Sequence, residues 1–482
     1  MLRSAVLHLV LLTSALAAAE PATPWDPATP AAVLQPIVRV QVAPPAPVFR
    51  VQDYGAKGDG TTYDTAAIQK AIDACAGTGG SVVLAEGRFV SANLVLKERM
   101  TFYVAKGAAL LGGLEVADYP EVMPTPPAKT WAWANRRSLL YAFAAHGLII
   151  DGEGEIDGRG KDVKMSGKEP LRPSLLRIFG SDDVTVRNVT FRNPRMWTCV
   201  YSECRRLTIQ GTTTDAPAYI ENLDGMDICD SEDVLIKDNV VASEDDAICL
   251  KSHGPPGLKN IRIENNRIHC HRANAIKIGT ATRGPITGLK IINNVVTRAQ
   301  YGGICIESVD GATLRDVVVQ GLEMRDVGQP IFIRLAARNG SLEPRPGPGS
   351  QQPLDSPEGP AIDGVLIERL RALKCHLRTA TATSTITGLT NLRVRNVTLR
   401  DVVLEVPGGL DKVPGEPPEK PRDYPQSNLF GKTPAAALYV RHADNVRLER
   451  VTVRLAKPDA RPWLATSDAT VATEACTPLQ AP

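Results

Sequence analysis

The chain has 482 residues, of which 43% are hydrophobic and 22% are charged, so it can bury a large core. Its formal net charge is only +2, which argues against a nucleic-acid-binding protein, because such proteins need a basic face that neutralises phosphates. A few local Lys or Arg residues could still hold an acidic ligand.

The first 19 residues have the layout of a secretory signal peptide. Arg3 precedes a mostly apolar run from Ala5 to Leu16, and three small residues follow at 17–19. The run is too short to span a bilayer comfortably, and prolines follow it at once. We therefore expect residues 1–19 to be cleaved and the protein to be exported, either secreted or periplasmic. No later segment is apolar enough to suggest a membrane partner.

Two further segments precede the main pattern of the chain. Residues 20–48 are rich in Pro and Ala and read as a linker. The stretch from Asp64 to Cys75 has the spacing of a short amphipathic helix, with Asp64 as its N-cap. Such a helix could cover the open end of a sheet structure, whose strand edges would otherwise invite pairing.

An internal repeat runs through most of the chain. Its copies alternate apolar and polar residues on both sides of a corner, as in DDVTVRNVTF from Asp182 and EDVLIKDNVV from Glu232. Short alternating strands that recur every 23 to 28 residues leave no room for full helices between them. The pattern predicts an all-β, right-handed parallel β-helix with three strands per coil, a capping helix and long loops. The corners lie 23, 27, 27 and 28 residues apart, at Asn188, Gly211, Asp238, Asn265 and Asn293.

The repeat indicates one β-helix domain over residues 49–465, followed by a tail at 466–482. A β-propeller is the competing fold, but its blades need longer periods and hairpin turns, whose signals are scarce here. Two insertions rich in Pro and Gly, at 339–361 and 406–427, should form long loops on the wall of the β-helix.

The nine cysteines leave at least one thiol unpaired, and none of them forms a CxxC pair that would suggest a zinc site. Cys229, Cys249 and Cys305 lie within apolar strand patterns and read as small core residues. Cys199 and Cys204 could pair in an oxidising compartment.

Three carboxylates are expected to meet on one face. Asp224 lies 21 residues before Asp245, close to one coil, and Asp246 follows directly; consecutive coils stack about 4.8 Å apart. Glycoside hydrolysis uses such a group, with a protonated acid for the leaving oxygen and a carboxylate base for water. One alternative is that these carboxylates are simply solvated. Another is a calcium site, with Glu244 and Asp227 nearby.

Residues 222–224 read Asn-Leu-Asp and residues 244–246 read Glu-Asp-Asp. They resemble the Asn-Thr-Asp and Gly-Asp-Asp motifs of glycoside hydrolase family 28, the polygalacturonase family, with the middle residue of the first changed and the Gly of the second replaced by Glu. The resemblance extends over nearly all of residues 50–465. The run YPQSNLFGKTPAAALYVRHADNV from Tyr424 is similar to bacterial members. Other similar segments are YGAKGDGTTYDTAAIQKAID from Tyr54, KGAALLGG at 106–113, GEGEIDGRG at 152–160 and FRNPRMWT at 191–198.

The resemblance implies a pectin-lyase-like fold and a division of roles among the carboxylates. Asp245 would be the general acid, and Asp224 and Asp246 would together activate water, with inversion at the anomeric carbon. Asn222 of the first motif would contact the substrate. Because all three aspartates are then committed to catalysis, we expect no metal and no cofactor.

Two further motifs depart from the family more strongly. The usual Gly-His-Gly aligns with residues 273–275, so Asn274 replaces the His; His269, His271 or Arg272 could substitute for it. The family's Arg-Ile-Lys motif, which holds a galacturonate carboxylate, aligns with residues 305–307.

Glu307 therefore stands where the family has a cation. Lys277 and Arg334 alternate with apolar neighbours and should point outward, so they could hold the substrate carboxylate instead. Trp131 and Trp133 could stack on a sugar ring, or could pack under their own loop.

These observations favour a monomeric, inverting hydrolase of pectic polysaccharide. The altered Arg-Ile-Lys motif keeps open a rhamnogalacturonan or a neutral galactosyl linkage as the substrate. A catalytically silent, polysaccharide-binding β-helix is a third reading, and a calcium-dependent lyase on the same scaffold is a fourth.

Overall fold

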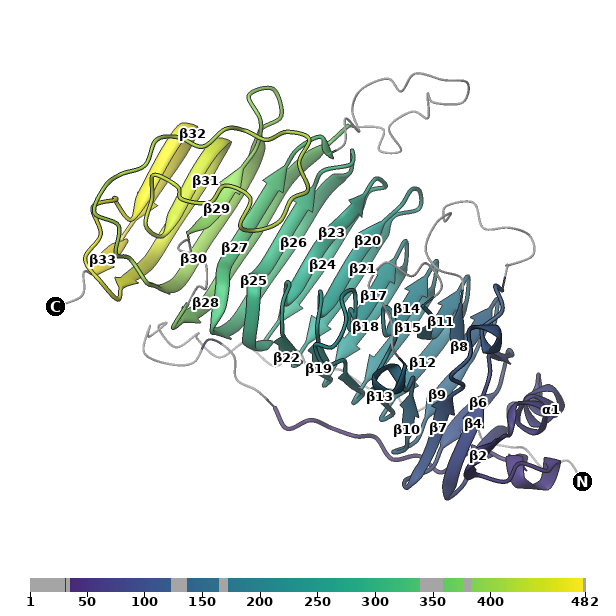
Figure 1. Cartoon of the computed structure of the whole chain (residues 1–482). Coiled ribbons are helices and arrows are strands. Elements are labelled where there is room, and N and C mark those ends of the chain that lie inside the picture. The colour runs from purple at the N-terminus through teal and green to yellow at the C-terminus, as the bar shows by residue number, and fades with distance from the viewer. Residues whose placement is uncertain are drawn as a thin grey trace, which may run out of the picture.

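The computed structural model describes residues 31, 35–122, 137–163, 172–338, 359–375 and 383–479. These residues form a right-handed parallel β-helix, as the repeat predicts: every paired strand lies parallel to the strand one coil before and one coil after it (Figure 1). The strands form three parallel faces, and the apolar residues of the alternating pattern stack between them in one continuous core.

The first face carries the candidate site. Its strands are β5 (Leu94–Leu96), β8 (Ser138–Phe143), β11 (Ser174–Phe179), β14 (Cys199–Ser202), β17 (Met226–Cys229), β20 (Ile248–Ser252), β23 (Ile276–Thr282), the second half of β25 (Val295–Ser308), β27 (Val327–Leu335), β29 (Ser384–Thr387), the start of β31 (Leu438–Leu455) and β32 (Leu464–Glu474).

The second face consists of β1 (Val48–Arg50), β3 (Ser81–Leu84), β6 (Thr101–Val104), β9 (Ile149–Asp151), β12 (Asp182–Arg187), β15 (Arg205–Gln210), β18 (Glu232–Lys237), β21 (Leu258–Glu264), β24 (Ile286–Ile292), β26 (Thr313–Arg325), β28 (Ala361–Leu373) and β30 (Val394–Val406). The third consists of β2 (Asp59–Tyr63), β4 (Gly87–Ser91), β7 (Ala108–Gly112), β10 (Glu155–Asp157), β13 (Thr190–Arg192), β16 (Thr213–Asp215), β19 (Val240–Ser243) and β22 (Arg267–Cys270), continued by parts of the long strands and by β33 (Thr477–Leu479).

The predicted corners have the left-handed backbone conformation that such a bend requires. The φ angles at Asn188, Gly211, Asp238, Asn265 and Asn293 are 66°, 65°, 57°, 53° and 52°. Asn and Asp tolerate this region better than other non-glycine residues do, because their short side chains can bond locally.

The residue after the corner carries the side-chain ladder between coils. The Asn266 Oδ1 accepts hydrogen bonds of 3.0 and 2.9 Å from the backbone and amide nitrogens of Asn239. The Asn294 Oδ1 accepts two bonds of 2.9 Å from Asn266 in the same way. All three side chains are fully buried, so the ladder satisfies polar groups inside the bend that water cannot reach.

A helix closes the N-terminal end, as predicted. Helix α1 (Thr65–Cys75) packs beside β1, β3 and β5, and it buries Ile68 and Ile72 against the first coil (Figure 1). Asp64 holds the N-cap position, but its carboxylate bonds to the backbone nitrogens of Lys57 (2.7 Å) and Gly58 (3.0 Å) instead of the helix. Short 3-10 helices lie at η1 (Val51–Tyr54), η2 (Val116–Asp118) and η3 (Gly160–Asp162).

At the other end, β32 and β33 pair with β31, so strands continue beyond residue 465 into the segment that the sequence pattern assigns to the tail. The expected signal peptide at 1–19 lies outside the described residues. Among the described segments, no helix has the length and apolarity needed to cross a bilayer. All nine cysteines are free thiols, including Cys199 and Cys204, so these two do not pair.

Candidate active site

The three candidate aspartates lie side by side, because two neighbouring coils present them just before strands of the first face. Asp224 precedes β17, and Asp245 and Asp246 precede β20. The backbone nitrogen of Gly225 donates a hydrogen bond of 3.0 Å to the carbonyl oxygen of Asp246, which fixes the two segments against each other. Asp224 and Asp246 are buried, whereas 18% of the Asp245 side chain is exposed.

Asp245 sits between a cation and an amide. Its Oδ2 accepts a hydrogen bond of 2.9 Å from the Arg272 guanidinium, which also contacts Glu244, and a longer one of 3.4 Å from Asn222. Burial and the negative charge of Asp246 raise the pKa of Asp245 to about 6, while Arg272 opposes the rise. This carboxyl is therefore protonated in mildly acidic solution, as a general acid must be.

The environment of Asp246 favours its ionised form instead. Its Oδ1 accepts hydrogen bonds from the Asn274 amide (2.7 Å) and backbone nitrogen (3.2 Å), and its Oδ2 lies 3.2 Å from the Lys277 ammonium. Burial alone would raise the pKa of Asp246, but Lys277, Lys251 and the Asn274 amide together hold it below its usual value. In mildly acidic solution, Asp246 is therefore ionised while the neighbouring Asp245 is protonated.

Asn274 is itself held in place, since its Oδ1 accepts a bond of 2.9 Å from the backbone nitrogen of Gly302. Asn274 is therefore a rigid amide beside Asp246. His269 and His271 meet edge to face with ring centroids 4.7 Å apart, and His269 bonds to Thr297. Of the three residues that could replace the missing His, Arg272 is the one that contacts an aspartate.

A second cluster lies beside Asp224. It includes Lys251 and Trp197, which the sequence analysis did not assign to the site. The Lys251 ammonium forms an ion pair with the fully buried Asp227 and lies 3.7 Å from Asp224. It also lies over the Trp197 ring, 4.5 Å from its centroid. Burial and the charge of Asp227 raise the pKa of Asp224 well above its usual value. The alternation of ICLKS does point Lys251 outward, so this signal was present in the sequence.

This cluster does not have the chemistry of a calcium site. Ligand atoms of Asp224, Asp227 and Cys249 lie within 4.8 Å of one another. Calcium takes six to eight oxygen ligands, whereas this group offers two carboxylates and a thiol. The Lys251 ammonium already lies among them, 3.0 Å from the Cys249 Sγ, and supplies the positive charge. Glu244, the other candidate ligand, pairs with Arg272.

The structure separates the two cations proposed to hold a substrate carboxylate. Lys277 and Arg334 both alternate with core residues and point out of the β-helix, but both side chains are almost fully buried. Lys277 contacts Asp246. Arg334 lies beside Glu307 in register, but its guanidinium donates hydrogen bonds to the carbonyl oxygens of Glu419 (2.7 Å) and Gly388 (3.2 Å). Arg334 is thus bound to a loop.

Glu307 lies on the strand after Lys277 and is fully buried. Among the described residues, neither of its carboxyl oxygens has a hydrogen-bond partner. Burial raises the pKa of Glu307 to about 8, although Lys277 opposes the rise. Glu307 is therefore a neutral carboxyl at the far side of Lys277. Trp131 and Trp133, the candidate sugar-stacking residues, lie outside the described residues.

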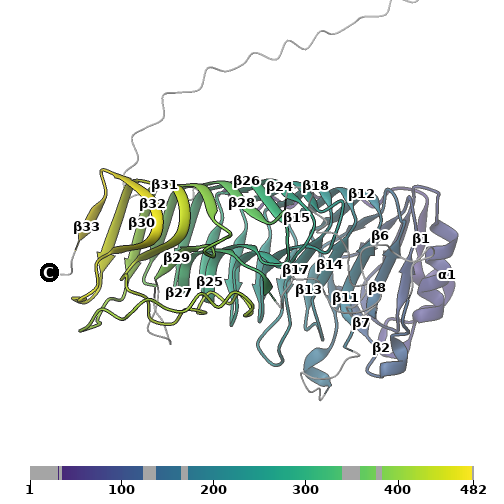
Figure 2. The ribbon, with the colours of Figure 1, turned by 90° about the horizontal axis from the view of Figure 1, so that it is seen from above.

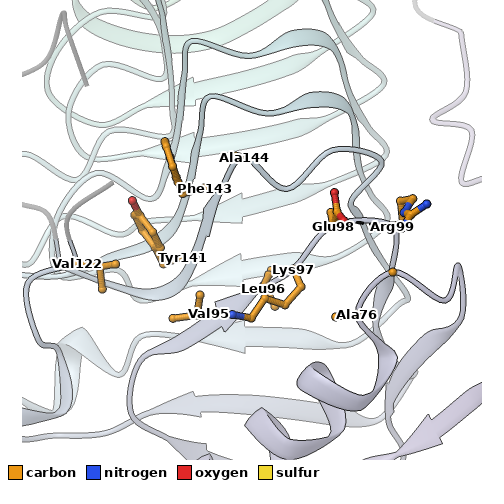
Figure 3. Close-up of a pocket in the computed structure, with 11 residues that line it drawn as sticks. Ala76, Val95, Leu96, Lys97, Glu98, Arg99, Val122, Tyr141, Phe143 and Ala144 are labelled. Atoms are coloured by element: carbon orange, nitrogen blue, oxygen red, sulfur yellow. Dashed lines mark ion pairs between the residues drawn. The ribbon is translucent and has the colours of Figure 1, made fainter. Parts of the chain in front are cut away.

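The same face bears a hollow of about 660 Å³ near its N-terminal end. Tyr141 and Phe143 of β8 project toward it, and Lys97, Glu98 and Arg99 lie along one side (Figure 3). The register Tyr141–Arg177–Val200–Asp227 places Tyr141 three strands before Asp227 on this face. None of the candidate aspartates lines the hollow.

Comparison with known proteins agrees with this geometry. The sequence model of glycosyl hydrolases family 28 matches residues 122–346, and that of rhamnogalacturonase A/epimerase, pectate lyase-like proteins matches residues 48–106. An exo-poly-alpha-D-galacturonosidase of Dickeya chrysanthemi is 26% identical over 62% of this chain and 59% of its own. A probable polygalacturonase of Arabidopsis thaliana is 28% identical over 59% of this chain and 60% of its own. The chain thus spans about 60% of the length of these curated relatives.

Solved structures share the fold. The family 28 exopolygalacturonase of Yersinia enterocolitica superposes with a TM-score of 0.64 at 20% identity, covering 88% of this chain and 78% of its own. A hyperthermoactive exopolygalacturonase of Thermotoga maritima gives a TM-score of 0.59 at 18% identity, covering 77% of this chain and 89% of its own. The family match covers the coils that carry the aspartates, so the chain is similar there to glycosyl hydrolases of family 28, and the solved structures share its fold.

Proposed function

We propose that the protein hydrolyses glycosidic bonds of pectic polysaccharide with inversion, and that Asp245 is its general acid. The observation that carries this proposal is the opposite protonation of two adjacent carboxyls. Burial raises the pKa of Asp245 to about 6, whereas Lys277 and Asn274 keep Asp246 ionised. Paired carboxyls with separated pKa values are what acid and base catalysis of glycoside hydrolysis requires.

In the proposed reaction, Asp245 donates its proton to the glycosidic oxygen as the bond to the anomeric carbon breaks. Asp246 takes a proton from a water molecule that attacks the opposite face of that carbon, so the configuration inverts. Asp224 would hold this water together with Asp246. Its raised pKa suits a group that binds water through a hydrogen bond while the ionised Asp246 accepts the proton.

A partly exposed cation beside the aspartates supports an acidic substrate. Lys251, Lys277 and Arg272 surround the aspartates, and 38% of the Arg272 side chain is exposed. We infer that Arg272, with its planar fork, is better placed than the loop-bound Arg334 to meet a sugar carboxylate. The names of the relatives as polygalacturonases support galacturonate as that sugar.

The buried Glu307 favours a second candidate. A neutral carboxyl beyond Lys277 offers no positive charge to a substrate carboxylate. This residue supports a rhamnogalacturonan or a neutral galactosyl linkage, in which one of the sugars beside the scissile bond carries no carboxylate. We also propose that residues 1–19 direct export and that the enzyme acts as a monomer without a metal or a cofactor.

The test is product analysis on polygalacturonate, rhamnogalacturonan and pectic galactan. A hydrolase releases reducing sugar without an unsaturated product that absorbs in the near ultraviolet, and proton NMR of the first product reports inversion. Release accompanied by that absorbance would point to a lyase. Absence of release from all three substrates would point to a binding protein.

A further inference from the structure

We propose that the 407–437 loop blocks the cleft directly beyond the aspartates, so that the enzyme removes short products from a chain end and does not cut within the polymer. This inference rests on the proposed function of the same site. It follows from what covers the outer surface of the first face on the C-terminal side of Lys277.

The outward side chains of the first face form two parallel rows. One row continues from Lys277 through Cys305, Phe332 and Thr385 to Tyr439. The other row runs from Glu307 through Arg334 and Thr387 to Arg441. A polysaccharide lying along this face beyond the aspartates would have to rest on these rows. Every one of these side chains is buried.

The 407–437 loop, which joins β30 to β31, is what covers them (Figures 1 and 2). Arg334 donates hydrogen bonds to the carbonyl oxygens of Glu419 (2.7 Å) and Lys420 (3.2 Å), and its guanidinium lies 5.2 Å from the centre of the Phe430 ring. Phe430 packs in turn on Cys305 and Phe332.

Two coils further on, Arg441 repeats the same attachment. It bonds to the carbonyl oxygen of Pro417 and lies 3.3 Å from the Glu416 carboxylate. Tyr439 also donates a hydrogen bond of 3.0 Å to Glu416. The loop is therefore bound to both rows through buried, charge-assisted contacts, which makes it a fixed wall over this part of the face.

The 407–437 loop contacts the site itself through Tyr424. Its hydroxyl lies 3.1 Å from the Lys277 ammonium and 3.1 Å from the Thr280 hydroxyl. Lys277 lies 5.1 Å from the centre of the Tyr424 ring. Arg338, in the segment that follows β27, lies 5.9 Å from the centre of the same ring. Since Lys277 contacts Asp246, the wall begins one side chain away from the proposed base.

This geometry leaves little room beyond the scissile bond. Neighbouring coils of a β-helix are about 4.8 Å apart, roughly the length of one sugar ring. The coil of Asp246 and the coil of Lys277 could together accept only a short end of the polymer before Tyr424 stops it.

The experiment is a time course on a long pectic polymer that the enzyme hydrolyses, in which viscosity, reducing ends and product sizes are followed together. The expected result is one short product size from the earliest samples, with viscosity falling far more slowly than reducing ends rise. A ladder of intermediate oligomers at early times would overturn the inference and leave the proposed function standing. Failure to release reducing sugar from any pectic polymer would reject the proposed function, and this inference with it.

Two variants test whether the wall is responsible. Tyr424→Ala removes the ring that stops the chain, so longer products and some internal cleavage are expected. Tyr424→Phe keeps the ring and loses only the hydroxyl, and it should retain the single short product. Product size does not depend on rate, so a slower enzyme still gives an answer, and circular dichroism checks that both variants fold. An unchanged product in a folded Tyr424→Ala enzyme would show that this loop does not set the mode of cleavage.

Discussion

The Arg272 guanidinium donates a hydrogen bond of 2.9 Å to the Asp245 carboxylate while it also pairs with Glu244. A cation this close stabilises the charged form of the acid and so opposes burial, which raises the pKa of Asp245 to about 6. Arg272 therefore sets how far into neutral solution the proposed acid keeps its proton.

This relationship predicts the pH dependence of kcat/KM. Asp245 must be protonated, so activity should fall as the pH rises through about 6. Asp246 must be ionised, and its lowered pKa places the acidic limb below the usual range of an aspartate. In Arg272→Gln, loss of the cation should raise the pKa of Asp245 and move the alkaline limb to higher pH, even if the maximum rate drops.

The matched control is Arg206→Gln, which removes an exposed arginine that pairs with Asp183 on the second face. Its pH profile should equal that of the unchanged enzyme. An alkaline limb that stays in place in Arg272→Gln, or that moves to lower pH, would contradict the assignment of that limb to Asp245.

The proposed general acid can be removed with little change in shape. Asp245→Asn should lower kcat by roughly 10²–10⁴-fold, because that is the usual contribution of a positioned acid or base. Asp183→Asn, at an exposed aspartate far from the site, should leave kcat unchanged. Thermal unfolding of both variants checks the fold. Near-normal turnover of Asp245→Asn on the best substrate would rule out its role.

The periodicity of the sequence predicted most of the fold and the meeting of the aspartates. Alternation and a repeat of about one coil place Asp224 and Asp245 on neighbouring coils, and the strands that follow them do pair, with Met226 opposite Ile248. The same reasoning could have found Lys251, which follows Asp227 by 24 residues, or about one coil. It was overlooked because an outward lysine in a strand is usually a solvated one.

The path of the 407–437 loop could not be predicted in this way. Alternation correctly turned Arg334 out of the core, but it says nothing about what lies above an outward residue. The contact of Arg334 with Glu419 joins residues 85 positions apart, and a segment rich in Pro and Gly has no period from which its course follows. The covered state of Arg334 thus depends on tertiary packing alone.

Activity should not depend on a divalent metal. The Lys251 ammonium lies among Asp224, Asp227 and Cys249, the described group that most resembles a metal site, and it already supplies their counter-charge. Dialysis against a chelator should therefore leave kcat/KM unchanged, and added calcium should have no effect. Loss of activity that calcium restores would contradict this assignment and would favour a lyase.

The last prediction separates two roles for Arg334. If it holds the 407–437 loop, Arg334→Met leaves the carbonyl oxygens of Glu419 and Lys420 without their buried donor. The free energy of unfolding should then fall by about 2–4 kcal/mol, measured by denaturant titration. Any loss of activity should be the same on acidic and neutral oligosaccharides, because the guanidinium meets neither substrate.

Arg262→Met serves as the comparison, since Arg262 is about half exposed on β21 and pairs with Glu264 on the same strand. A surface change of this kind should alter stability by less than about 0.5 kcal/mol. If Arg334→Met instead kept its stability and raised KM for acidic oligosaccharides alone, Arg334 would be a carboxylate-binding residue. The loop would then have to move aside for the substrate, because the guanidinium is 1% exposed beneath it.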